Sequence, residues 1–219
     1  QPISSFTLSA YYDQYTFPWL RFGVNSPSIG SEYWGQMLYK PSRYLEMYVR
    51  VRFKRKRRNH NSLTVLPFLA VEERINYRFH YTYQLSPSFR LKGRIEIVRY
   101  TRARDSSEKG VLFFQDVSFK SKNKPFSFVL RYGVFDTKSY RSRIYTYEND
   151  VLYSFSIPAF YNRGARTYCL LKYRMNKKID LWFRYGITVY DNLEEIGTGF
   201  EKIEGNYQQE VKFQIRIKW

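Results

Sequence analysis

Cysteine and histidine are scarce in this sequence. Its 219 residues include one cysteine, Cys169, and two histidines, His60 and His80. A single cysteine excludes an intrachain disulfide framework, and three dispersed ligands do not make a zinc site. Neither histidine has a serine or cysteine partner at a recognisable catalytic spacing. We therefore expect a non-enzymatic protein without a metal or a cofactor.

Long apolar runs are also missing. No stretch approaches the ~18 consecutive apolar residues that a transmembrane helix needs. This excludes helical spans only, because the strands of a transmembrane barrel need about 10 residues of alternating hydropathy. The chain starts at Gln1 without a basic and apolar leader. We therefore expect that a signal segment has been removed or that the chain is a piece of a longer protein.

Acidic residues are few compared with basic ones. Lysine and arginine together number 37, aspartate and glutamate 19, and the formal net charge is +18. Such an excess suggests an anionic partner, which could be nucleic acid, lipid headgroups or anionic solutes.

Aromatic residues and a period of two are abundant. Aromatic residues make up 20% of the chain and favour pleated, half-exposed sheet surfaces. The closing stretch QEVKFQIRIKW alternates polar and apolar residues without a break. This period is typical of a β-strand with one apolar and one charged face. Similar patterns predict about ten strands, at 5–13, 32–40, 44–54, 74–85, 89–97, 111–120, 126–135, 165–175, 179–190 and 209–219.

The predicted connections alternate strictly between short and long. The short ones are KPSR (40–43), SPS (86–88), SKNKP (121–125) and NKK (176–178), and their composition suits tight turns. All short turns therefore lie at one end of the strands and all long loops at the other. Outer-membrane barrels have this asymmetry, with short periplasmic turns and long external loops. The last strand then runs toward the short-turn end, which makes the C-terminus periplasmic.

We therefore predict one all-β domain, residues 1–219, that forms an antiparallel transmembrane β-barrel in a Gram-negative outer membrane. The chain would supply about ten strands, either as a whole barrel or as the C-terminal part of a larger one. Aromatic residues near the strand ends would form girdles at the membrane interfaces. A soluble barrel or meander shares the alternation but would bury its apolar face. Because the alternation alone does not distinguish the two, a soluble basic β-protein that binds nucleic acid stays open as an alternative.

The chain end resembles a known assembly signal. The apolar residues of the last strand resemble the C-terminal signal that the barrel-assembly machinery of outer membranes reads; they are Phe213, Ile215, Ile217 and Trp219. The resemblance makes this machinery an expected partner.

Several longer segments resemble one protein family. They are FPWLRFGVNSPSIGSEYW (17–34), YKPSRYLEMYVR (39–50), FDTKSYRSRIYTYENDVLYSFSIPAFYNRGARTYCLLKY (135–173), IDLWFRYG (179–186) and IGTGFEKIEGN (196–206). They are similar to the outer-membrane β-barrel region of large bacterial helix-hairpin-helix (competence-like) proteins. The resemblance implies a barrel of more than ten strands behind a helix-hairpin-helix module, and a link to DNA uptake or handling. This chain contains no such module, so its DNA binding is assigned to no residue here.

The face opposite the lipid is predicted to be a basic lumen. Its candidate residues are Arg50, Arg52, Arg78, Arg94, Arg131, Arg174, Arg184, Arg216 and Lys218. In a narrow barrel these charges would be filler that forms ion-pair ladders between strands. In a wider barrel they would attract an anionic cargo such as nucleic-acid phosphate, lipopolysaccharide or nutrients. Both interpretations stay open.

Two connections are candidate interaction elements. The stretch RFKRKRRNHN (52–61) predicts an external basic loop that contacts lipopolysaccharide phosphate or nucleic acid, or is simply solvated; its residues are Lys54, Arg55, Lys56, Arg57 and Arg58. The long connection 136–164 is predicted to contact a partner or gate the lumen; its residues are Asp136, Tyr145, Tyr147, Glu148, Asn149 and Asp150.

Together these features predict a pore, scaffold or translocation component with a basic lumen. The alternative is a structural subunit of a larger outer-membrane complex with a plugged lumen. Expected partners are the lipid bilayer, lipopolysaccharide and the assembly machinery, with other outer-membrane subunits and DNA or another anionic cargo as further candidates.

Overall fold

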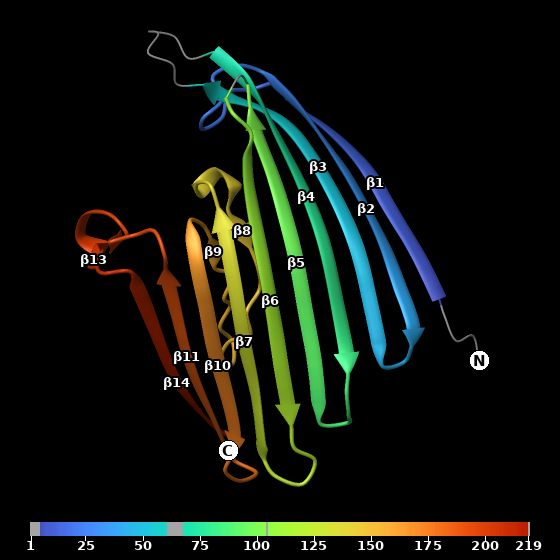
Figure 1. Ribbon diagram of the computed structural model, residues 1–219, viewed down its shortest axis with the longest axis vertical. Helices are drawn as coiled ribbons and strands as arrows, with labels where there is room; N and C mark the ends of the chain where they lie inside the picture. Colours follow the sequence, from blue (N-terminus) through green and yellow to red (C-terminus); the bar gives the residue numbers. More distant parts are fainter. Residues whose placement is uncertain (1–4, 61–67, 104, 219) are drawn as a thin grey trace.

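The chain folds as one ten-stranded antiparallel sheet (Figure 1). The computed structural model describes residues 5–60, 68–103 and 105–218. Within them, the only helices are two 3₁₀ turns, η1 (Tyr140–Ser142) and η2 (Gly199–Glu201). Neither has the length and hydropathy to cross a bilayer. The all-β prediction is therefore confirmed.

The strands of the sheet follow the order of the chain. They are β1 (Ser5–Phe17), β2 (Ser28–Ser42), β3 (Leu45–His60), β4 (Phe68–Gln84), β5 (Phe89–Arg102), β6 (Glu108–Lys120), β7 (Phe126–Thr137), β10 (Arg163–Arg174), β11 (Ile179–Tyr190) and β14 (Tyr207–Ile217). Two small hairpins lie in the connections, β8 (Ile144–Tyr145) with β9 (Ala159–Phe160) and β12 (Glu195–Ile196) with β13 (Ile203–Glu204).

The sheet has two free edges. Each strand pairs with its neighbours in the order, which starts at β1 and ends at β14. No pairing joins β1 to β14 in the described residues, so these residues form an open sheet and no closed barrel is present. Because β1 and β14 run in opposite directions in an even-numbered antiparallel sheet, their directions would allow an antiparallel pair.

All ten predicted strands are present, but several continue further toward the long-loop end. In particular, β3 reaches His60 and β4 begins at Phe68. The external basic loop at Lys54–Arg58 is therefore wrong, because these residues lie inside β3. Their strand pairing persists with Arg55 opposite Glu73 and Lys56 opposite Glu72, and both pairs are also ion pairs, at 3.5 and 3.4 Å. Residue 61 and the rest of that connection lie outside the described residues.

The predicted asymmetry of the connections is confirmed except between β5 and β6, where the connection, residues 103–107, is as short as the turn 121–125 at the opposite end. Short turns join β2 to β3, β4 to β5, β6 to β7 and β10 to β11 at one end of the sheet (Figure 1). One side chain organises each turn by accepting a hydrogen bond from the backbone N–H three residues later. The acceptors are Ser42, Ser86, Ser121 and Asn176, at 3.2, 3.1, 3.0 and 2.8 Å. Serine and asparagine thus set the hairpins locally, as their side-chain chemistry predicts.

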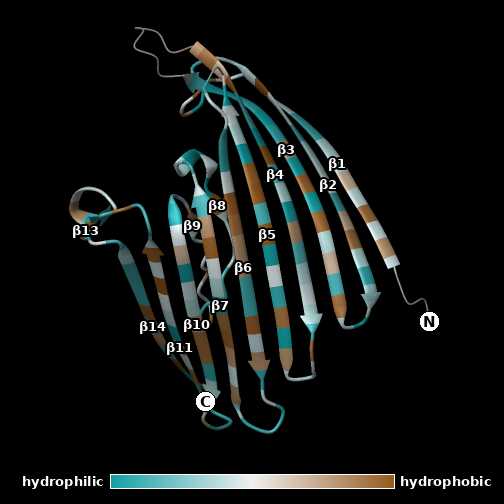
Figure 2. Cartoon of the chain, viewed as in Figure 1, coloured by the Kyte–Doolittle hydropathy of each residue, from teal (hydrophilic) through white to brown (hydrophobic). Residues whose placement is uncertain are grey.

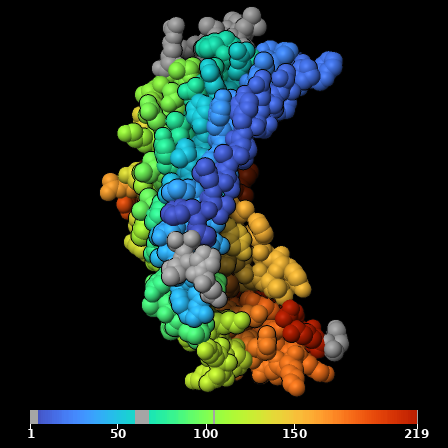
Figure 3. Space-filling view, turned by 90° about the vertical axis from the view of Figure 1, so that its right-hand side faces the viewer, coloured from blue at the N-terminus to red at the C-terminus, as the bar shows by residue number. Residues whose placement is uncertain are grey.

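The two faces of the sheet differ in polarity and in cover. The strands alternate apolar and polar residues along their length (Figure 2). One face, which we call the inner face, is covered by part of the β7–β10 connection, which stands on one side of the curved sheet (Figure 3). The opposite, outer face is apolar and uncovered, with Phe213 63%, Ile215 52% and Val49 45% exposed.

Candidate functional site: a charged inner face

The structure brings all the predicted lumen arginines to the inner face. Strand alternation places Arg50 and Arg52 on the same side of β3 as Arg78 on the neighbouring β4, with Arg52 opposite Asn76 and Arg50 opposite Arg78. The same alternation places one further arginine on the inner face of each of β5, β7, β10, β11 and β14. These arginines are Arg94, Arg131, Arg174, Arg184 and Arg216 in that order, and Lys218 lies just beyond β14. Their carboxylate partners are unevenly distributed along this row.

On the C-terminal half, a bidentate ion pair joins β6 to β7. Arg131 Nε and Nη2 donate to the two carboxylate oxygens of Asp116 at 2.5 and 2.7 Å. Both side chains are almost fully buried, and the guanidinium carbon lies 3.8 Å from the ring centroid of Phe114. The parallel two-bond geometry is the strong form of this contact.

Arg184 of β11 is the centre of a larger network. Its side chain is fully buried and donates to Glu148 and Glu210, each at 2.5 Å. Arg166 of β10 donates to both oxygens of Glu148 at 2.8 and 2.9 Å. One carboxylate thus compensates two guanidiniums, and removing it would leave both charges buried with fewer partners.

Asp180 gathers the cations near the short-turn end. Its buried carboxylate accepts from Arg174 at 3.2 Å, from Arg216 at 3.1 Å and from Lys218 at 3.1 Å. This part of the predicted lumen is therefore an ion-pair ladder across β10, β11 and β14, as the filler interpretation expects.

The β7–β10 connection folds back onto the inner face. We call residues 138–162 the inner segment. Alternate residues Ile144, Thr146 and Glu148 are buried against the sheet, while Tyr145 and Tyr147 are exposed. Backbone carbonyls of the segment also accept from strand side chains, Tyr147 from Arg131 at 2.8 Å and Leu152 from Gln214 at 2.9 Å.

An ion pair of Asp150 joins the inner segment to β14. Lys212 donates to its carboxylate at 2.7 Å, and Arg184 lies 3.8 Å away. Burial alone would raise the pKa of Asp150, but the hydrogen bonds from Lys212 and from the backbone of Val151, with the charge of Arg184, lower that pKa overall. Asn149 contributes its carbonyl to Arg184 at 3.1 Å.

One predicted member of this element lies elsewhere. Asp136 belongs to β7 and is exposed on the outer face, so its assignment to the connection is wrong. The strand pairing of β7 with β10 includes Asp136, which lies opposite Arg163.

A small apolar core explains where the segment docks. Several apolar residues interrupt the polar face of the strands, and the segment covers them with Ile144 and Phe160; the cluster consists of Val98, Leu112, Phe114, Phe135, Ile144, Phe160, Tyr190 and Ile196. Apolar residues on the polar face of a strand, such as Leu112 and Phe114 on β6, are a signal in the sequence that an element covers the inner face.

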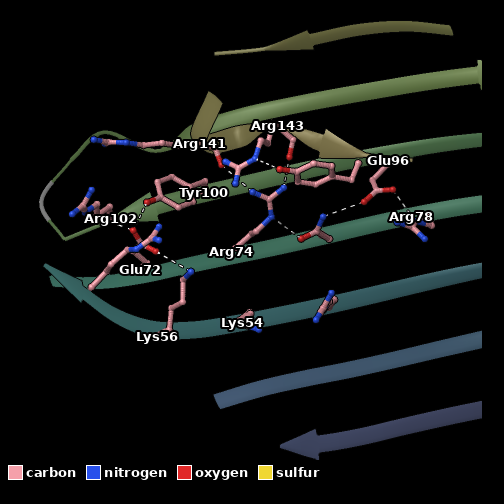
Figure 4. A pocket seen from close by; sticks show the side chains of 14 residues that line it. Lys54, Lys56, Glu72, Arg74, Arg78, Glu96, Tyr100, Arg102, Arg141 and Arg143 are labelled. Atoms are coloured by element: carbon pink, nitrogen blue, oxygen red, sulfur yellow. Dashed lines mark hydrogen bonds and ion pairs between the residues drawn. The ribbon is translucent and has the colours of Figure 1, made fainter. Parts of the chain in front are cut away.

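On the N-terminal half, cations outnumber carboxylates. A cavity of about 430 Å³ lies at the long-loop end of β3, β4 and β5 beside the inner segment, and Figure 4 shows its lining. We call its charged lining the basic cradle. It has nine basic side chains and two acidic ones: Arg52, Lys54, Lys56, Arg58, Arg74, Arg78, Arg102, Arg141 and Arg143, with Glu72 and Glu96.

The outer face carries an apolar band, whose height is the same on three neighbouring strands. On β3, β4 and β5 the band covers 45–53, 75–83 and 89–97, about nine residues each, and 9–11 residues is the length of a transmembrane β-strand. A charged rim ends the band toward the long loops. Its members are Arg55, Glu73, Arg99, Lys109, Asp136, Arg163 and Asp191, and Arg55 with Glu73, Arg99 with Lys109 and Asp136 with Arg163 are opposite in register.

A glutamine within the band is hydrogen-bonded through both ends of its side-chain amide. Gln115 is the main polar side chain there. It accepts a hydrogen bond from Tyr81 and donates to the carbonyls of Asp116 and Lys92 at 3.0 and 3.3 Å. Such satisfaction is what an environment without water demands.

Aromatic rings border the band at the short-turn end. Phe89 and Phe119 lie with ring centroids 4.8 Å apart, and Phe119 contacts Phe128 at 5.5 Å. Phe6 stacks on Tyr39 at 4.3 Å. Of the predicted assembly-signal residues, Phe213, Ile215 and Ile217 are exposed on the outer face, and Trp219 lies outside the described residues.

The remaining reactive residues are isolated. Cys169 is a free, half-buried thiol on the outer face of β10. Among the described residues, no group of three or more His, Cys, Asp and Glu side chains is arranged to hold a metal ion.

Comparisons of the chain with family models, with curated proteins and with solved structures find no match. The resemblance to the helix-hairpin-helix proteins therefore stays a prediction.

Proposed function

We propose that this chain forms the wall of a transmembrane β-barrel in a Gram-negative outer membrane, with the outer face against lipid and the inner face lining a lumen. The wall would be completed by pairing of β1 with β14 or by further strands. The protein is a pore or translocation component that admits anionic solutes. Lipid, lipopolysaccharide and the barrel-assembly machinery are its partners in this proposal.

One observation carries the proposal: the apolar face is uncovered, whereas the inner segment folds back over part of the charged face. A soluble sheet would bury its apolar side, because exposed apolar patches larger than a few hundred Å² mark interfaces. Here the band has the height of a bilayer core, a charged rim at one border and aromatic rings at the other.

The experiment is extraction and electrophoresis of the full chain. The proposal expects the protein to need detergent for extraction and to migrate faster on gels before boiling than after it. Full solubility without detergent would contradict the proposal and favour a soluble basic β-protein.

A plugged structural subunit is the second candidate. It is favoured by the inner segment, because Glu148 and Asp150 fix this segment across the C-terminal half of the inner face. Planar-bilayer recordings separate the two. Anion-selective conductance supports a pore, and a silent protein that still inserts supports the plugged subunit.

A further inference from the structure

The basic cradle combines a cavity with two guanidinium groups, those of Arg74 and Arg143, that lack carboxylate partners among the described residues. Other cations of the cradle are paired. Arg52 and Lys54 contact the buried Glu32 at 2.7 and 3.1 Å, and Arg141 lies 3.2 Å from Asp105. Arg74 Nε donates to Asn76 at 3.2 Å and Nη1 donates to the carbonyl of Arg141 at 2.9 Å; Nη2 donates to the carbonyl of Arg143. All three acceptors are neutral. No carboxylate of the described residues lies within ion-pair distance of Arg74, so its charge is held in place but not compensated.

Arg143 is in the same situation. It donates to the hydroxyl of Tyr145 and to the carbonyl of Tyr140, each at 2.6 Å, and its guanidinium carbon lies 4.0 Å from the Tyr140 ring centroid. In the described part of the chain, this side chain also has no ion pair. Figure 4 shows Arg74 between the strands and the arginines of the inner segment.

The two carboxylates of the cradle are already engaged. Glu96 accepts from Arg78 at 2.7 Å and from Asn76 at 3.1 Å. Glu72 accepts from Tyr100 at 2.9 Å and pairs with Lys56 at 3.4 Å. They therefore have little capacity left for Arg74 or Arg143, and like charges gathered in one cavity repel unless an anion enters.

We propose that the basic cradle binds a phosphate-bearing solute. Guanidinium groups with free N–H donors match phosphate oxygens in pairs, and backbone carbonyls hold these arginines so that little ordering is needed on binding. A cavity of about 430 Å³ exceeds one phosphate and suits a chain of two or three linked phosphates or a phosphorylated sugar. The inference rests on the proposed function for the ligand's route, because the cavity lies at the long-loop end of the strands that would line the lumen.

The test measures binding to the full chain in detergent, where neither a pore nor a bilayer is needed. The probe is tripolyphosphate, and its binding affinity is measured by calorimetry at low salt. The double variant Arg74→Gln with Arg143→Gln should lose about tenfold or more in affinity, because charge-assisted hydrogen bonds to the ligand are removed.

A matched control changes the same charge elsewhere. Arg43 and Arg90 lie at the short-turn end, and each contacts a neutral partner, Tyr44 and Gln84. The double variant Arg43→Gln with Arg90→Gln should change affinity by less than about twofold, since its charges lie far from the cradle. Arg143→Gln alone changes one half-buried side chain and should give an intermediate loss even if the double variant fails to fold.

The outcomes separate this site from the function. Equal losses in cradle and control variants, or no binding of tripolyphosphate by the wild type, would overturn the cradle while leaving membrane insertion intact. Cradle-dependent binding to lipopolysaccharide vesicles without binding of free tripolyphosphate would overturn the solute and assign a lipid headgroup instead. Tripolyphosphate binding by a protein that does not insert into membranes would support the cradle and contradict the pore.

Discussion

The two halves of the inner face are built from the same kind of strand, yet their arginines have different partners. On the C-terminal half, Arg184 and Arg166 share Glu148, which comes from the inner segment and not from a strand. On the N-terminal half, the same segment contributes Arg141 and Arg143. A single connection thus compensates charge at one place and adds charge at another. Whether a basic strand face is neutralised or keeps unpaired cations therefore depends on the segment that folds over it.

The largest expected effect comes from removing the compensation. Glu148→Ala removes one of the two carboxylates that Arg184 and Arg166 share, the other being Glu210, and removing a partner of a buried charge costs up to about 3–5 kcal/mol. Urea unfolding in detergent should show this loss. Glu194, an exposed acid in the β11–β14 connection, gives a matched control, and Glu194→Ala should stay within about 0.5 kcal/mol. Similar small losses in both variants would mean that the network does not stabilise the fold.

The reverse change gives the cradle its own carboxylate. Arg143→Glu places an acid near Arg74 and Arg141, where the exposed geometry allows a gain of up to about 1 kcal/mol. The same variant should abolish the binding of tripolyphosphate, because the acid competes with it for the arginines. The measurements are urea unfolding and calorimetry. Retained binding would show that Arg74 is not a ligand.

A smaller effect follows from acid. Because the pKa of Asp150 is lowered in the folded protein, its contribution is present above the unfolded pKa of about 3.9 and is lost as the pH falls further. The C-terminal end of the inner segment should therefore loosen below about pH 4. Hydrogen exchange of residues 148–154 across pH 3–6 measures this. Lys212→Met should shift the loosening to higher pH, and an unchanged profile would contradict the role of Lys212.

The strands could be predicted because apolar residues occupy every second position on the outer face over about nine residues of strands such as β3, β4 and β5. The strand prediction fails where polar and apolar residues no longer alternate. Beyond Phe53, β3 carries charge on both faces, Lys54 and Lys56 inward and Arg55 and Arg57 outward, so hydropathy no longer alternates although the ladder continues. The basic loop was predicted wrongly for this reason.

The contacts of the inner segment could not be predicted from the sequence. Glu148 lies 18 residues from Arg166 and 36 from Arg184, and no local period connects them. The even residues of 144–148 alternate in the right phase, but a short stretch of this kind does not say which face of which strand it covers. The contacts of Arg74 could not be predicted from the sequence either, because it donates to backbone carbonyls of a distant segment.

The native thiol of Cys169 allows a direct test of whether the outer face contacts lipid. Cys169 lies on that face opposite Leu130 and Tyr185, within the apolar band. A nitroxide attached to it in bilayers should collide often with oxygen and rarely with a water-soluble nickel complex. The control is a label at Ser118→Cys with Cys169→Ser, on the inner face, which should show the opposite preference. Ready access of the nickel complex to the label on Cys169 would contradict contact with lipid.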